Sequence, residues 1–127
     1  MIDIKTNLIS LFPSDVIKSY YATTNALEQI EVVVFSNYAL LLGDLVVNKS
    51  LLSNGFDRVE YLQDIIYITK NNTSIPSELD TITHTLRLSR TLGGIKTEVT
   101  TISELTKITD KIYYCIIQLR VIDIQAV

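Results

Sequence analysis

The residues best suited to chemistry in this 127-residue chain are its single histidine, His84, and its single cysteine, Cys115. A zinc site takes four protein ligands in its structural form and three in its catalytic form, most of them histidine or cysteine. Two such side chains are too few, so we expect no metal centre and no bound cofactor. Cys115 stands in the apolar stretch YYCII and is expected to be packed inside the protein.

Three carboxylates, Asp57, Glu60 and Asp64, are spaced three and four residues apart, which would place them on one face of a helix. We interpret them as a solvated polar face, because no Glu-x-x-His pair accompanies them as a di-iron bundle requires. The sequence also lacks a Walker loop, a G-x-G-x-x-G loop and a Gly-x-Ser-x-Gly elbow. We therefore expect no catalytic residues and a protein that is not an enzyme.

The segment HTLRLSRTLGG, residues 84–94, resembles the phosphoacceptor segment of histidine phosphotransfer domains. That segment reads His-x-Leu-Lys-Gly with a further glycine about ten residues after the histidine. His84, Leu86, Arg87 and Gly94 match it, with Arg87 in place of lysine. The resemblance implies a helical bundle in which His84 accepts a phosphoryl group and Arg87 steadies its charge. This phosphotransfer role is the alternative function that the sequence offers.

A second resemblance concerns residues 38–55, which look like the helix–turn segment of phycobiliproteins through Tyr38, Gly43, Asp44 and Gly55. The resemblance implies a helix followed by a turn. The cysteine that would carry a bilin is missing from the preceding residues, so we expect no chromophore.

The charges of the chain exclude several classes of partner. Its 11 Lys and Arg and 14 Asp and Glu give a net charge of −3, and the basic residues are scattered, so we expect no nucleic acid. The most apolar run, residues 32–47, is interrupted by Asp44 and is shorter than the roughly 20 residues of a membrane-spanning helix. We expect no membrane insertion. The lack of a disulfide framework favours an intracellular location, or a place within a multi-protein particle.

Hydrophobic periodicity predicts an all-α fold, an elongated bundle of about four helices that forms a single domain over residues 1–127. Apolar residues three and four apart predict a helix over about 14–47, with Ser14 and Asp15 at its start. Asn54-Gly55 marks a turn. Further helices are predicted over about 56–70, from Pro76 to the glycine pair at 93–94, and over about 97–122.

Residue types favour a different fold. Ile, Val and Thr make up 42 of the 127 residues, and β-branched side chains are enriched in strands. The alternative prediction is an α+β domain with an antiparallel sheet, whose strands would lie near residues 31–36, 62–69, 80–92 and 112–125.

The last predicted helix is apolar on nearly all sides, more than a four-helix bundle covers. We therefore expect an interaction surface on this helix, formed by Leu105, Ile108, Ile112, Ile116 and Leu119, or on the tyrosine-bearing face of the first helix, at Tyr20, Tyr21 and Tyr38. The alternative is that these residues form the core. The resulting hypothesis is a non-enzymatic structural, assembly or adaptor protein. It would bury apolar helix faces in a homo-oligomer or against a protein partner, for example as a subunit of a viral or organellar particle.

Overall fold

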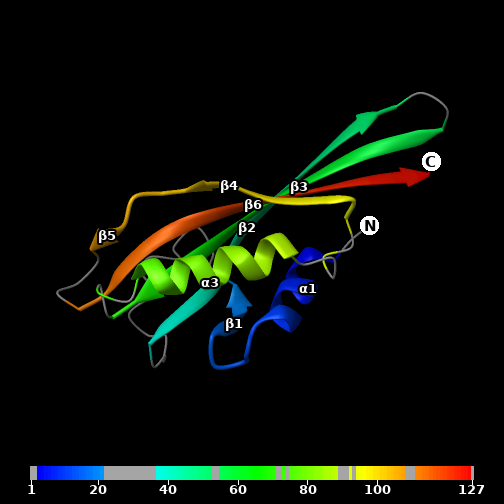
Figure 1. Cartoon of the computed structure of the whole chain (residues 1–127). Coiled ribbons are helices and arrows are strands. Elements are labelled where there is room, and N and C mark those ends of the chain that lie inside the picture. The colour runs from blue at the N-terminus through cyan, green and yellow to red at the C-terminus, as the bar shows by residue number, and fades with distance from the viewer. Residues whose placement is uncertain are drawn as a thin grey trace.

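The computed structural model describes residues 3–21, 37–52, 55–70, 73, 75–88, 92, 94–107 and 111–126. Within these residues, the protein is mostly an antiparallel sheet with two helices on one side of it (Figure 1). The helices are α1 (Ile4–Leu11) and α3 (Ile75–Leu88). The strands are β1 (Ile17–Tyr21), β2 (Tyr38–Leu51), β3 (Phe56–Thr69), β4 (Lys96–Ile102), β5 (Thr106–Lys107) and β6 (Tyr113–Ala126).

The sheet has the strand order β1-β2-β3-β6-β4 within the described residues, and β5 pairs with β6 as well. β1 runs parallel to β2, and all the other pairs are antiparallel. β2, β3 and β6 have 14 residues each and form the long centre of the sheet. Gly55 has a φ of 80°, the left-handed conformation that suits glycine in a tight turn between β2 and β3.

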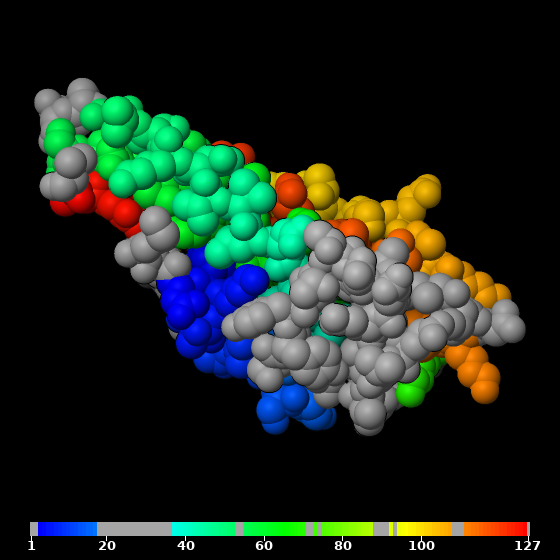
Figure 2. Space-filling model, turned by 180° about the vertical axis from the view of Figure 1, so that it is seen from behind, coloured from blue at the N-terminus to red at the C-terminus, as the bar shows by residue number. Residues whose placement is uncertain are grey.

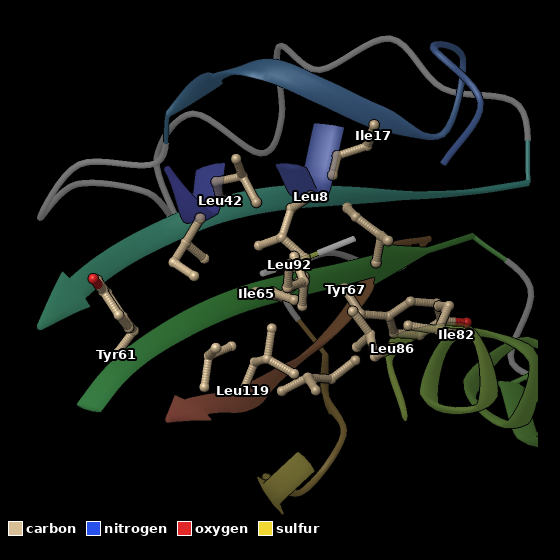
Figure 3. Close-up of a cluster of buried hydrophobic side chains, with 14 of the residues drawn as sticks. Leu8, Ile17, Leu42, Tyr61, Ile65, Tyr67, Ile82, Leu86, Leu92 and Leu119 are labelled. Carbon is tan, nitrogen blue, oxygen red and sulfur yellow. The ribbon is translucent and has the colours of Figure 1, made fainter. Parts of the chain in front are cut away.

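The main core lies between the sheet and the two helices (Figure 3). Every second residue of β3 and β6 points into it, as expected for strands with one face against helices. Its buried members include Leu8 of α1, Ile82 and Leu86 of α3, and Ile65 and Leu119 of the sheet. A smaller buried cluster on the opposite face of the sheet contains Ala39, Leu41, Ile66 and Ile68.

Both helices have local reasons for their positions. Asp3 caps α1, because its side chain accepts a hydrogen bond from the backbone N–H of Thr6 at 3.1 Å. This bond lowers the pKa of Asp3. α3 has Glu78 in its first turn and Arg87 in its last, an arrangement that suits the helix dipole. The helix predicted to begin near Pro76 is confirmed by α3.

The predicted all-α bundle is wrong. Strands occupy most of what the periodicity assigned to helices over 14–47, 56–70 and 97–122, although residues 22–36 of the first lie outside the described residues. In the phycobiliprotein-like segment 38–55, residues 38–51 form β2 instead of a helix. The physical reason is that β3 and β6 are central strands with apolar residues on both faces. In such a run, apolar residues recur at the three- and four-residue spacing of a helix as well as at the two-residue spacing of a strand.

The alternative α+β prediction fits better. Its strands at 62–69 and 112–125 lie almost wholly within β3 and β6. Its strand at 80–92 is wrong, because residues 75–88 form α3, and its strand at 31–36 lies outside the described residues.

Neither helix is long and apolar enough to cross a membrane, in the part of the chain that the structure describes.

Candidate functional site

Among the described residues, most of the exposed large apolar side chains lie on an arm of the sheet that extends beyond the helices (Figure 1). We define the arm as residues 46–52, 55–60 and 122–126, the far ends of β2, β3 and β6. Of the nine large apolar residues that are exposed among the described residues, six belong to it: Val46, Val47, Leu51, Leu52, Phe56 and Ile124. Leu51 is 84% exposed and Val46 50%. Figure 2 shows the arm from behind, with β2 along its surface. Val47 and Leu51 lie on one face of the arm, whereas Val46, Phe56 and Ile124 lie on the other. Large exposed apolar side chains gathered on one projecting element are typical of an interaction site.

The outer edge of β2 is the second feature of the arm. β1 pairs with β2 only at Leu40, Leu41 and Leu42. Among the described residues, no strand pairs with the rest of this edge, from Gly43 to Leu51. The edge therefore presents unpaired backbone donors and acceptors beside exposed apolar side chains, which is the combination that favours pairing with another strand.

A β-bulge separates the arm from the covered part of β2. Gly43 and Asp44 lie where the register shifts between Leu42 and Leu45. The buried side chain of Gln63 donates from Nε2 to the carbonyl oxygens of Gly43 at 2.9 Å and of Asp64 at 2.8 Å. Gln63 thus satisfies backbone acceptors that the bulge leaves unpaired, and it holds the base of the arm in one conformation.

Four of the five charged side chains of the arm, all except Asp123, form ion pairs within the chain. Lys49 Nζ lies 3.1 Å from Oδ2 of Asp57, whose side chain is 5% exposed. Glu60 Oε2 lies 3.1 Å from Arg120 Nε and 3.5 Å from Arg58 Nη2. Arg120 also reaches Glu98 on β4, at 3.3 Å. Because these charges neutralise one another, the arm offers mainly apolar side chains and backbone groups to a partner.

A polar contact joins α3 to the sheet at the end away from the arm. The hydroxyl of Tyr67 donates a hydrogen bond to Oε2 of Glu78, and the ring of Tyr67 lies against that of Tyr38, with centroids 5.9 Å apart. Burial and then the bond to Glu78 raise the pKa of Tyr67, and burial followed by the charges of Glu78 and Asp15 raises that of Tyr38. Both phenols therefore stay protonated at neutral pH, and their contacts are structural.

Alkaline pH is expected to destabilise the fold through Cys115. Burial raises the pKa of this thiol to about 11, whereas an unfolded cysteine titrates at about 8.5. Between these values the folded chain binds more protons than the unfolded chain, so the free energy of unfolding falls as the pH rises. We expect a loss of about 1–2 kcal/mol between about pH 8 and pH 10, measured by urea unfolding. The Cys115→Ala variant provides the control, and an equal loss in that variant would disprove the assignment to the thiol.

His84 and Arg87 both lie on exposed positions of α3. The helical bundle that the phosphotransfer resemblance implies is absent from the described residues, where α3 packs on a sheet instead. Gly94, which also matched that segment, lies against β6. A Cβ atom there would come within 2.5 Å of a methyl group of Val121. Close packing against β6 therefore explains why residue 94 is a glycine, without any role in phosphotransfer.

The residues predicted to form one helical interface do not share a face. Leu119 is fully buried in the main core, whereas Ile112 and Ile116 pack against the cluster on the opposite face of the sheet. Leu105 is exposed between β4 and β5, and Ile108 lies outside the described residues. The interface cannot be the helix face that periodicity predicted, because residues 113–126 form β6.

The three spaced carboxylates are also separated by the strand. Side chains alternate between faces, so Glu60 and Asp64 share one face of β3 while Asp57 lies on the other. Within the described residues, no group of three or more His, Cys, Asp and Glu side chains is arranged to hold a metal ion.

The arm was missed because residues 46–47, 56–60 and 122 were assigned to the ends of three predicted helices and its other residues to no element. One signal pointed to it: an Asn-Gly pair between apolar runs is the strongest short-range indication of a β-hairpin. Asn54-Gly55 stands at this position.

The chain matches no protein-family model and no curated protein, so its function has to be inferred from its own geometry.

Proposed function

We propose that this protein is a non-enzymatic assembly subunit that associates with further copies of itself through the arm. The observation that carries the proposal is the coincidence of exposed apolar side chains with an unpaired strand edge on the same projecting part of the sheet. The proposal keeps the assembly role expected from the sequence and moves its surface from helix faces to strands.

Energetics support an interface at this place. Covering a Leu, Val or Phe side chain contributes about 1.5–3 kcal/mol for each residue that becomes fully buried. The arm exposes Leu51, Phe56 and four further large apolar residues. Five of the six are 38–50% exposed, so covering each of these contributes about half of that value or less. Burial in both copies can offset a loss of freedom on association toward the lower end of the estimated range of about 4–15 kcal/mol.

Charge substitutions on the arm are expected to weaken self-association. A Leu51→Lys, Phe56→Lys double variant places two cations in the apolar surface and removes two anchors. We expect the dissociation constant to rise by at least about 30-fold, because a loss of about 2 kcal/mol corresponds to that ratio. Static light scattering over a concentration series gives the mass, and far-ultraviolet circular dichroism verifies that the sheet is retained.

Two matched controls accompany this variant. Ile95→Lys changes an apolar residue that is 69% exposed but lies outside the arm, and it should leave the mass unchanged. His84→Gln should also leave it unchanged, although it would abolish activity in a phosphotransfer domain. A wild-type chain that stays monomeric at all concentrations, or an equal effect of Ile95→Lys, would refute the proposal.

A further inference from the structure

We infer that the edge of β2 from Gly43 to Leu51, with which no strand pairs among the described residues, pairs antiparallel with the same edge of a second copy of the chain, with Asn48 on the twofold axis. We call this segment the free edge. The inference rests on the proposed self-association and adds the strand, the symmetry and the register. An open strand edge is a template for pairing, and two identical strands related by a twofold axis give a closed dimer.

The limits of the free edge determine where the axis can lie. β1 occupies the edge at Leu40, Leu41 and Leu42. At the other end, the backbone N–H of Leu52 donates to the carbonyl oxygen of Phe56 and closes the hairpin. A pairing centred on residue 48 places residue 44 opposite residue 52, so it uses the free edge and stops short of β1. A centre at residue 46 would place residue 50 opposite residue 42, where β1 already lies.

The side chains fit the same register. Leu45 and Leu51 lie on one face of β2, because they pair with Gln63 and Asp57 of β3, an even number of residues apart. Centred on residue 48, Leu51 of each copy lies opposite Leu45 of the other, and these apolar cross-strand pairs stabilise a sheet. The two Asn48 side chains meet at the axis, where amides can donate to and accept from each other. A centre at residue 47 would instead oppose Leu45 with Lys49.

Lys49 does not prevent this pairing. A lysine on an edge strand normally opposes association. Here its ammonium lies 3.1 Å from the buried carboxylate of Asp57 in the same copy, so the charge is balanced before the copies meet. In the proposed register Lys49 lies opposite Val47, whose methyl groups can pack on the lysine stem.

Disulfide cross-linking tests the register. The chain is prepared with Cys115→Ala and Asn48→Cys and is oxidised with oxidised glutathione. Directly opposed residues have Cα atoms about 4.5 or 5.5 Å apart, which is within the disulfide range of about 4.4–6.8 Å. We expect most of the chain to run as a covalent dimer in non-reducing electrophoresis. Ser50→Cys alone should not cross-link, because the two residues would lie about 13 Å apart along the strands.

A mixed experiment provides an independent check that does not alter the central residue. Val46→Cys and Ser50→Cys, both with Cys115→Ala, should form a heterodimer when combined and little homodimer when oxidised separately. Self-association by light scattering without either cross-link would overturn the paired edge and leave the proposed assembly role standing. A monomer at all concentrations would overturn both. Efficient cross-linking of Ser50→Cys alone would contradict the register.

Discussion

The Tyr67→Ala variant is expected to lose about 3–5 kcal/mol of unfolding free energy, the range for removing a large aromatic side chain from a core. Tyr67 is fully buried on the central strand β3, opposite Leu40 of β2 and Cys115 of β6. Its ring lies against Tyr38, and its hydroxyl bonds to Glu78 on α3 (Figure 3 shows the surrounding core). One side chain therefore packs between strands and also attaches a helix to them.

Tyr67→Phe separates these two contributions. It keeps the ring and removes only the hydroxyl, so we expect a loss of about 1.5–3 kcal/mol, the typical net value of a hydrogen bond to a charged group. Urea unfolding followed by circular dichroism measures both variants. If Tyr67→Phe destabilised the fold as much as Tyr67→Ala, the bond to Glu78 rather than packing would be the main contribution, against our expectation.

The second large effect is expected for Gly94→Ala, with a loss of about 3 kcal/mol. A Cβ atom at this position would lie 2.5 Å from Cγ1 of Val121 and 2.7 Å from the carbonyl oxygen of Ile122. Overpacking of this kind typically costs about 1–3 kcal/mol. The upper end applies because the carbonyl belongs to the backbone of β6 and cannot move aside. Next to it, the N–H of Ile95 donates to the same carbonyl at 2.8 Å, which aligns the start of β4 with β6.

Gly55→Ala is the matched control for this prediction. Gly55 has a φ of 80°, but among the described residues a Cβ atom at this position would have no atom within 4 Å apart from those of its chain neighbours. Alanine there should cost about 1 kcal/mol through backbone strain alone. Thermal unfolding compares the two variants, and an equal loss in both would contradict a steric origin at Gly94.

The sequence allowed some elements to be predicted because their signals are local. α3 has a proline at its second position and an acidic residue in its first turn. Its apolar residues Ile75, Ile82 and Leu86 are seven and four residues apart, which is a helical spacing, and polar residues lie between them. The hairpin between β2 and β3 likewise has a local signal in the sequence, the adjacent pair Asn54-Gly55. The apolar neighbours of Cys115 also predicted that this cysteine is packed inside the protein, and its burial confirms that prediction.

The sequence did not determine the sheet in the same way. Tyr61 pairs with Val121, a residue 60 positions later in the chain, and no local window contains both. With apolar residues on both faces of β3 and β6, local spacing favoured helices, whereas pairing between distant segments makes them strands. The β-branched composition was the better guide, because it does not depend on the phase of the pattern.

The exposure of the arm likewise depends on contacts between distant segments and not on the local sequence. Leu42 and Leu51 belong to one strand and have the same side chain, yet Leu42 is fully buried and Leu51 is 84% exposed. The sequence by itself indicated a helix from near Pro76, although its alternative prediction made residues 80–92 a strand, and it indicated a hairpin before Phe56. It also showed that the chain has one histidine and one cysteine. These features depend on residue types and near neighbours. Only the tertiary structure decided which apolar residues stay exposed, because the exposure of a side chain depends on where α1, α3 and the other strands end.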